Sequence, residues 1–472
     1  MSPSLPHSAF VLPARAIPCA MVPPAASLDG VERASAPVIQ EGEASTDAMA
    51  WLGQMTANQY RATNNCSRYL LLEDDLDSAG LGWTAHMLVN VLWIAMRQDR
   101  VLLEVPLNAS WRHAGKAHSN WHKKSHVADP DGKRPRWCDR APWTLQCLYQ
   151  PWTSCPAPTT AVRVYTPGLN EKNDIPLTRV FNTKRYRRAP IVRLKLSWIA
   201  ASGSTWLSGR GRQTPAQFAA NVRQQAAKYQ AGVHLLFRPR AWIAHLGRCI
   251  LESAQLMQRP EGFIAVHVRA SAEKAAEVKK RQGADLPGIA DYYELTRMFA
   301  RRLGQPKVFL QTSSPGSVSG FAQLADRDGL ELSFTNNTRS EHDSWGGWSP
   351  TGQMESALVG AVNLHVPSSH ASVFISLHLS AWTDLVGARG WHGGTHYKLC
   401  CASKPSALAW WRACKLPTIS VFVRRGVALN VSDVLDSVPQ SQRRCLLWKH
   451  YRSLYHLQRQ AHFPALGSGT GQ

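Results

Sequence analysis

The sequence has no long apolar run. No stretch of about 18 apolar residues without charge occurs in the 472 residues, although a helix that crosses a bilayer needs one. The best candidate, residues 81–96, contains His86 and Asn90 and is followed by Arg97. We therefore predict a buried helix there and no visible membrane anchor. Residues 1–60 are rich in Pro, Ala and Ser, lack the apolar core of a signal peptide, and are predicted to be a disordered leader.

Acidic residues are few. The chain has 32 Asp and Glu against 54 Lys and Arg, which gives a net charge of +22. Such an excess attracts anions: nucleic acid, membrane phosphates or a phosphorylated substrate. The basic residues are spread mostly singly or in pairs, and the densest run is 184–188. Since no zinc-finger spacing and no RNA-binding signature accompany them, we expect no nucleic-acid partner.

Cysteine is sparse, with ten residues in the whole chain. This number excludes a disulfide scaffold but is compatible with a few bridges in a large secretory domain. Sequons of the form Asn-x-Ser/Thr occur at Asn65, Asn108, Asn336 and Asn430. Sequons agree with a lumenal address but also arise by chance.

Two patterns raise the question of a metal. Asp75-Leu76-Asp77 has the Asp-x-Asp form that holds a divalent cation in many glycosyltransferases, but it does not follow a nucleotide-binding strand. His392 and His396, with Cys400 and Cys401, would suit zinc on a helix. Gly393-Gly394 disfavours that helix, so an acidic turn and an incidental cluster are the preferred interpretations, and we predict no metal site.

The elements alternate between strands and helices. We predict a helix after Gly80-Leu81-Gly82, a strand over 101–105 and a capped helix over 214–236. In the second half we predict strands at 263–268, 308–312, 330–334 and 363–366, and helices at 292–303, 321–325, 353–362 and from 369. This order predicts an α/β protein with a doubly wound parallel sheet, whose ligands bind at the carboxyl ends of the strands.

One segment concentrates charge directly after a buried strand. Gly262-Phe-Ile-Ala-Val-His267-Val268-Arg269 is followed by Ala-Ser-Ala-Glu273-Lys274-Ala-Ala-Glu277. An arginine fork suits two phosphate oxygens, and a nearby carboxylate can take a proton from a hydroxyl. Strand-to-helix loops with mixed charge are also common as solvated loops.

This segment resembles the His-Val-Arg-Arg-x-Asp-Lys signature of the α-1,6-fucosyltransferases and their bacterial nodulation relatives. Further resemblances occur in the same order along the chain, at Gly80-Leu81-Gly82, Arg238-Pro239-Arg240-Ala241-Trp242, Val308 to Pro315 and Pro367-Ser368-Ser369-His370. They cover about residues 65 to 385. The resemblance implies a GT-B-like fold with two Rossmann-type halves, an acceptor-side domain at 61–255, a GDP-fucose-binding domain at 256–390 and a C-terminal extension at 391–472.

The resemblance also implies roles for single residues. Arg269 matches the arginine on the donor diphosphate, and Glu277 matches the general base. Lys274 matches the signature lysine if one residue is inserted. The remaining matched positions are the binding residues His267, Ser369, His370, Glu355, Gly80 and Gly82. A bridge between Cys66 and Cys155 is implied as well, with Cys138–Cys147 as a second pairing.

The implied reaction is an inverting, metal-independent transfer of fucose from GDP-fucose to a glycan hydroxyl, without a cofactor, in the Golgi or secretory lumen. The family pattern is broken at Ala270, at Ala272 or Glu273, at Ser313-Ser314 and at His370. Two alternatives therefore stay open: a protein O-fucosyltransferase, and a nucleotide- or glycan-binding protein without turnover. The acceptor, the linkage and the oligomeric state are not fixed by the sequence.

Overall fold

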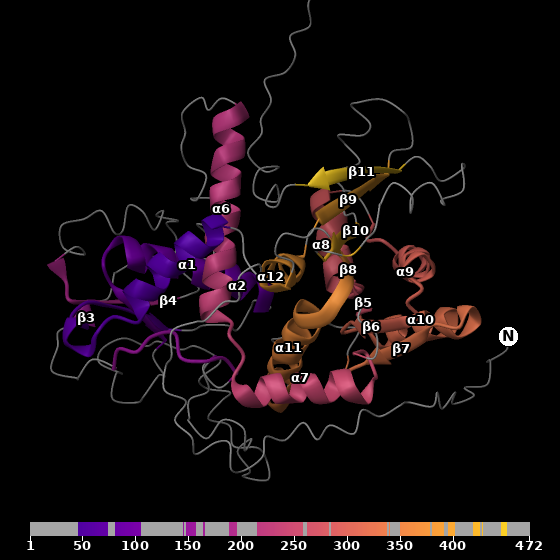
Figure 1. Ribbon diagram of the computed structural model, residues 1–472, viewed down its shortest axis with the longest axis horizontal. Helices are drawn as coiled ribbons and strands as arrows, with labels where there is room; N and C mark the ends of the chain where they lie inside the picture. The colour runs from indigo at the N-terminus through magenta and orange to yellow at the C-terminus, as the bar shows by residue number, and fades with distance from the viewer. Residues whose placement is uncertain are drawn as a thin grey trace, which may run out of the picture.

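The chain forms two α/β units, each built on its own sheet (Figure 1). The computed structural model describes residues 46–73, 81–104, 145, 148–156, 164–165, 188–195, 215–257, 262–282, 285–337, 339, 350–377, 380–390, 395–401, 419–424, 427 and 445–450. Figure 1 places the first unit on the left and the second on the right, with the long helix α6 and the short helix α12 between them. The prediction of an α/β chain with two Rossmann-type halves is confirmed.

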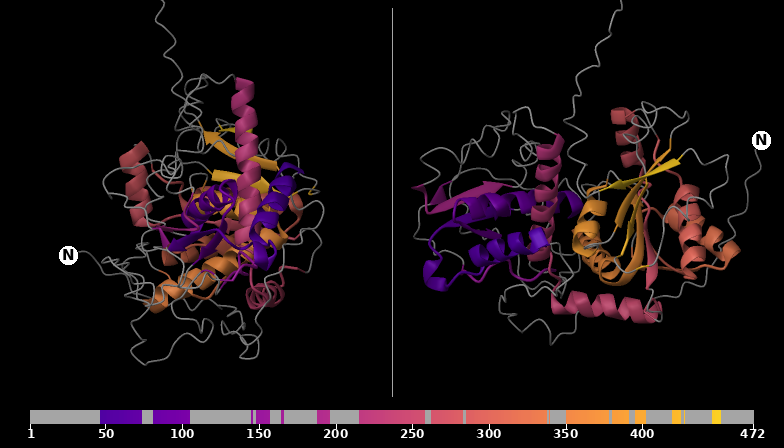
Figure 2. Two further views of the ribbon diagram at one scale, coloured as in Figure 1. Left: turned by 90° about the vertical axis from the view of Figure 1, so that its left-hand side faces the viewer. Right: turned by 45° about the horizontal axis from the view of Figure 1, so that its top comes forward.

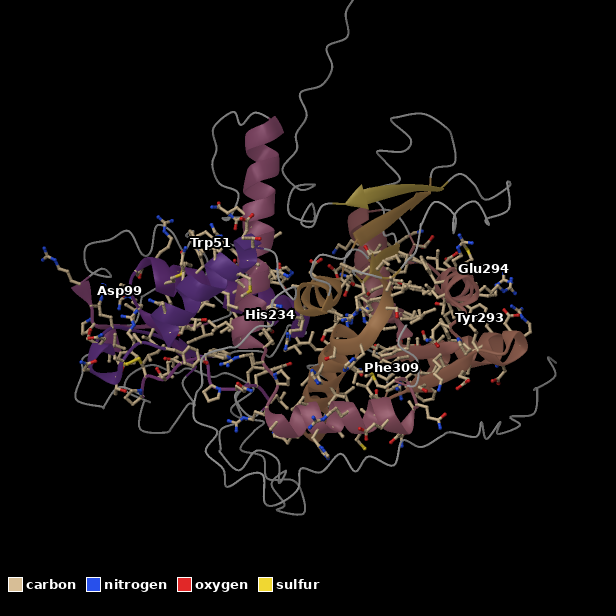
Figure 3. The ribbon with its side chains drawn as sticks, in the orientation of Figure 1. Trp51, Asp99, His234, Tyr293, Glu294 and Phe309 are labelled. Atoms are coloured by element: carbon tan, nitrogen blue, oxygen red, sulfur yellow. A yellow bond between two sulfur atoms is a disulfide. The ribbon has the colours of Figure 1, made fainter. Side chains whose placement is uncertain are left out.

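The first unit has a four-stranded parallel sheet in the order β2-β1-β4-β3. Its elements are α1 (Thr46–Gln59), a 3-10 turn (Thr63–Asn65), β1 (Tyr69–Glu73), α2 (Leu81–Arg97), β2 (Val101–Glu104), β3 (Val164–Tyr165), β4 (Ile191–Lys195) and α6 (Pro215–Leu236). The predicted disordered leader is wrong over residues 46–59, because they form α1 and bury Leu52 and Met55. The buried Lys228 ammonium lies 4.5 Å from the ring centre of Trp51 and 5.0 Å from that of Trp93. These cation–π contacts join α6 to α1 and α2, and Trp51 is labelled in Figure 3.

The second unit has a seven-stranded mixed sheet in the order β11-β9-β10-β8-β5-β6-β7. Its elements are α7 (Ala241–Ser253), β5 (Phe263–His267), α8 (Ala272–Gln282), α9 (Ile289–Leu303), β6 (Lys307–Gln311), α10 (Pro315–Asp328), β7 (Glu331–Phe334), α11 (Pro350–His370), β8 (Ala371–Leu377), α12 (Ala381–Gly390), β9 (Thr395–Cys401), β10 (Ile419–Val423) and β11 (Cys445–His450). Strands β5, β6 and β7 are parallel, as predicted, and β8 is parallel to β5, while β10, β9 and β11 run antiparallel to their neighbours. Figure 2 shows the two sheets on either side of α6 and α12.

Two sequence predictions about the second unit need correction. Residues 363–366 are not a strand and no helix starts near Ser369, because α11 runs on to His370 and the strand is β8. The predicted extension after residue 390 supplies three strands to the second sheet, so the sheet continues across that boundary.

The helix α11 continues through Pro367, a residue that normally interrupts a helix. Proline has no amide hydrogen, so the carbonyl of Asn363 loses its usual intrahelical partner. The side chain of Gln311, at the end of β6, donates to this carbonyl at 2.7 Å. A distant side chain therefore replaces the missing backbone hydrogen bond.

A one-residue irregularity lies between β5 and β8. Phe263 pairs with Ala371, but Ile264 pairs with Val373, so Ser372 is an extra residue. The preceding Gly262 has a φ of 77°, and a side chain there would collide with the carbonyl oxygen of His370. This position requires glycine both for its backbone angle and for space.

The bridge between Cys66 and Cys155 is present, which confirms the pairing implied by the resemblance. Cys249 is also disulfide-bonded, whereas Cys138 and Cys147 lie outside the described residues. Among the described helices, none is both long and apolar enough to cross a membrane.

We expect the Cys66→Ser/Cys155→Ser double variant to lose about 2–5 kcal/mol of unfolding free energy, since the bridge joins residues 89 positions apart and restricts the unfolded chain. Denaturant unfolding measures this loss. Each single variant should lose as much as the double variant, because either change removes the whole bridge. Equal stability of the double variant and the unchanged protein would contradict the bridge.

Candidate functional site

The carboxyl end of β5 leads directly into the capped start of a helix. All five residues of β5 are buried, and the strand ends at His267. Four residues later Ser271 caps α8, and its Oγ accepts a hydrogen bond from the backbone amide of Lys274 at 3.3 Å. The first amides of a helix carry partial positive charge, so this turn presents an electropositive end beside the strand.

Four of the predicted site residues belong to this strand–turn–helix segment, with His267 at the end of the strand. Arg269 is half-buried in the turn and close enough to His267 to influence its protonation. On α8, the Nζ of Lys274 lies 2.9 Å from Oε2 of Glu277, an ion pair between residues three apart. Arg269, Lys274 and Glu277 therefore all follow the carboxyl end of β5 within ten residues. The predicted base is paired with the predicted lysine.

His267 is buried and held by a chain of hydroxyl groups. Its Nδ1 lies 2.8 Å from Oγ of Ser376, which lies 2.6 Å from Oγ1 of Thr383. Burial, and secondly the charge of Arg269, lowers the pKa of His267 to about 3. The imidazole is therefore neutral at pH 7 and contributes no positive charge to an anion site.

Gln311 fastens the ends of three elements beside His267. Its amide donates to Asn363 of α11, as described above, and its Oε1 accepts from the indole nitrogen of Trp382 at 3.2 Å. The Trp382 and His267 rings lie 6.2 Å apart between centres. The ends of β5 and β6 and the start of α12 therefore form one connected edge.

The first unit contacts the second at this same edge. Gly82 of α2 is buried, and an added side chain would collide with the backbone of Ala381 and Trp382 at the start of α12. Next to it, His86 Nε2 lies 3.3 Å from Asp384 Oδ2, and the His86 ring stacks on Tyr229 with centres 4.3 Å apart. Gly82 therefore acts as a close contact between helices, which is the packing alternative to its predicted ligand role.

Another contact joins the two units further along α12. His234 of α6, labelled in Figure 3, lies on the part of the helix next to the second unit. Its Nδ1 is 3.1 Å from a guanidinium nitrogen of Arg389. Because a guanidinium only donates, this nitrogen of His234 is an acceptor.

Two of the other predicted binding residues lie away from this edge. Ser369 and His370 precede β8, so they lie at the amino end of a strand parallel to β5, whereas His267 lies at the carboxyl end. Ser369 donates to the carbonyl of His365 at 2.7 Å. Glu355 lies in the first half of α11, and Gly80 lies outside the described residues. Ser369 and His370 are therefore not grouped with Arg269.

Four residues of the site were missed by the sequence analysis: Gln311, Ser376, Trp382 and Thr383. Three of them were missed because 369 onward was predicted as helix, which hid both the strand β8 and its carboxyl end. The run Ala371–Leu377 is apolar at nearly every position, a signal of a buried parallel strand that could have found them.

The departure from the family pattern at Ser314 has a structural role. Ser314 caps α10, and its Oγ accepts from the backbone amide of Ser317 at 2.9 Å. Serine and aspartate are equally good caps, so this departure leaves the helix start intact.

The structure describes only part of the two sequence patterns that could suit a metal. Asp75, Asp77 and His392 lie outside the described residues, and His396, Cys400 and Cys401 lie on strand β9 rather than on a helix. Within the described ranges no three His, Cys, Asp or Glu side chains gather as metal ligands do.

Comparisons with known proteins find similarity to solved structures alone. No protein-family model and no curated protein matches the chain. A solved structure of an arginine-to-lysine mutant of FUT1 from Arabidopsis thaliana, in complex with GDP, is similar with a TM-score of 0.37 and 10% identity over 74% of each chain. A likeness of this strength carries no inference about residues or reaction, so the function has to be argued from the site.

We expect Gly82→Ala to lower the unfolding free energy by about 1–3 kcal/mol, because the added methyl group overpacks the contact between α2 and α12. Gly53→Ala is the matched control: it lies in α1 with no neighbouring atom within 4 Å, and alanine is the better helix former there. Denaturant unfolding compares the two. A stability loss no larger than that of the control would contradict the contact.

We expect acid to destabilise the protein partly through His267. Its folded pKa of about 3 is below its ordinary value of 6.5, so between these values only the unfolded state takes up the proton. The stability present above pH 6.5 is then lost on acidification, at about 1.4 kcal/mol per pH unit for one such histidine. His365, whose pKa burial lowers to about 4, adds to this loss.

His267→Gln should reduce the proton uptake on unfolding between pH 4 and 6 by about one proton, measured from the unfolding free energy at each pH. An unchanged slope in His267→Gln would mean that the imidazole is not held neutral.

Proposed function

We propose that the protein is a GDP-sugar glycosyltransferase that transfers fucose from GDP-fucose to a glycan hydroxyl, with the N-glycan core or a related glycan as acceptor. The observation that carries this proposal is the convergence of Arg269, Lys274 and the electropositive start of α8 at the carboxyl end of β5, beside the contact with the first unit. In sheets of this kind, nucleotides bind at the carboxyl ends of the parallel strands. The resemblance of the same segment to the α-1,6-fucosyltransferase signature supports the choice of donor.

The donor diphosphate would bind the fork of Arg269 and the first amides of α8. Lys274 would then leave Glu277 and pair with phosphate oxygens, because the diphosphate carries more negative charge than one carboxylate. The exchange costs little, because an ion pair between partly exposed side chains contributes only about 0–1 kcal/mol. Diphosphate binding would thereby remove Lys274 from the carboxylate of Glu277.

Glu277 would accept the proton of the acceptor hydroxyl while the hydroxyl oxygen attacks the anomeric carbon. The new carbon–oxygen bond forms on one face as the bond to the β-phosphate breaks on the other, so the configuration inverts. Arg269 and Lys274 would stabilise the charge that grows on the departing GDP. These side chains can neutralise the leaving group, so the proposed reaction requires no metal.

The disulfide between Cys66 and Cys155 supports an oxidising compartment, since such bridges persist there and are rare in the cytosol. We therefore propose the Golgi or secretory lumen as the location.

One observation favours a second candidate function. With Glu277 paired to Lys274 and with Ala270 in place of the second signature arginine, the same segment would suit a protein that binds GDP-sugars without turnover. Turnover restricted to folded protein acceptors would instead indicate a protein O-fucosyltransferase.

A donor screen tests the proposal. The protein is incubated with GDP-fucose, GDP-mannose or UDP-sugars, with and without an N-glycan acceptor, and the released nucleotide diphosphate is measured. We expect GDP release from GDP-fucose that requires the acceptor and persists in EDTA. GDP binding without release would support the binding protein, and release of UDP alone would overturn the proposal.

We expect Arg269→Ala to weaken GDP binding about 10- to 100-fold, because it removes charge-assisted hydrogen bonds to the diphosphate. Arg327→Ala, which removes an exposed arginine of α10 paired with Asp328, is the control for loss of charge and should bind GDP normally. Glu277→Gln should keep the GDP affinity and lower the turnover rate by a factor of about 10²–10⁴. Unchanged GDP affinity in Arg269→Ala, measured by titration calorimetry, would show that the site is elsewhere.

A further inference from the structure

The hydroxyl chain behind His267 has a fixed direction. Thr383 Oγ1 lies 2.7 Å from the carbonyl oxygen of Leu377, which can only accept, so the single hydrogen of this hydroxyl points to Leu377. Ser376 must then donate to Thr383 across their 2.6 Å contact. Oγ of Ser376 is left to accept, and Nδ1 of His267 donates to it over 2.8 Å.

The state of the ring follows from this direction. A neutral imidazole carries one hydrogen, and here it is on Nδ1, so Nε2 has a lone pair and accepts. The members of the chain are well fixed: Ser376 is fully buried, Thr383 is 1% exposed, and both belong to the elements β8 and α12 that pack beside β5. Because both hydroxyl groups are buried, water does not compete for these hydrogen bonds, and their direction is kept.

We propose that Ser376 and Thr383 are positioning residues that hold His267 as the Nδ1–H tautomer, so that Nε2 accepts a hydrogen bond from a hydroxyl of the sugar nucleotide. The proposal rests on the proposed function and deepens it. Phosphate oxygens at neutral pH have no hydrogen to offer, so Nε2 is matched to a ribose or sugar hydroxyl and not to the diphosphate. Arg269 would thus bind the charged diphosphate, and His267 would bind a neutral hydroxyl of the same ligand.

The tautomer can be measured without any ligand. In protein labelled with ¹⁵N at histidine, with the His267 signals identified by their loss in His267→Gln, we expect hydrogen on Nδ1 and none on Nε2 at pH 7. Hydrogen on Nε2 in the unchanged protein would overturn the proposal, whatever the protein binds. This measurement does not depend on the proposed function.

A matched pair of variants tests the role of the chain. Thr383→Val keeps the shape but removes the hydroxyl, so Ser376 loses its acceptor and can donate to Nδ1. We then expect the ring hydrogen to move to Nε2. Thr383→Ser keeps the hydroxyl and should keep the Nδ1–H signal. If Thr383→Val does not fold, Ser376→Ala is used, and loss of the Nδ1–H preference there supports the same chain; an unchanged tautomer in the folded variant contradicts it.

Binding measurements then identify the hydroxyl. In Thr383→Val the donor group of the ligand would face Nε2–H, and we expect about tenfold weaker binding, with recovery in Thr383→Ser. Loss of affinity for both GDP and GDP-fucose indicates a ribose hydroxyl, and loss for GDP-fucose alone indicates a sugar hydroxyl. If the tautomer switches but both affinities stay unchanged, Nε2 does not bind the ligand and the proposal fails. If the unchanged protein binds neither ligand, the proposed function fails instead.

Discussion

The position of the candidate site depends on one extra residue in β8. Counted from the pairing of Phe263 with Ala371, an unbroken register would place His267 opposite Ile375. Because Ser372 is inserted, His267 lies opposite Ser376, and an apolar neighbour is replaced by a hydroxyl. The left-handed backbone at Gly262 stands at the start of this irregularity. Bulges of this kind redirect side chains near functional sites, and here the shift supplies the hydrogen-bond partner of a buried histidine.

Much of the fold follows from local patterns in the sequence. Helix α2 was predicted because residues 81–96 are apolar on all sides, and β5 and β6 because each is a short apolar run. These elements are buried on both faces, so their composition alone reveals them. The end of α11 was not predictable in this way. The helix continues through Pro367, and the carbonyl of Asn363, which proline leaves without a donor, accepts a hydrogen bond from Gln311, 52 residues before Asn363.

In the candidate site, too, local sequence patterns predicted some residues, and contacts between distant segments determined the others. Arg269, Lys274 and Glu277 follow one strand within ten residues, so the sequence could place them together. Ser376 and Thr383 come from β8 and α12, and only the pairing of distant strands brings them to His267. Ser369 and His370 were predicted to bind the donor, but they lie at the amino end of β8, whereas Arg269 follows the carboxyl end of β5. The short motif was therefore matched at the wrong end of a strand. A one-dimensional match carries no information about which edge of a sheet it occupies.

The apolar interior is continuous across the two units. One cluster of buried side chains includes Leu70 and Leu72 of the first sheet and Phe263, Phe309 and Phe374 of the second. Domains that rotate against each other usually meet through small, polar interfaces, whereas a shared hydrophobic core resists such rotation. The protein is therefore expected to behave mechanically as a single block. A ligand at the end of β5 would therefore bind next to two sheets that keep their relative positions.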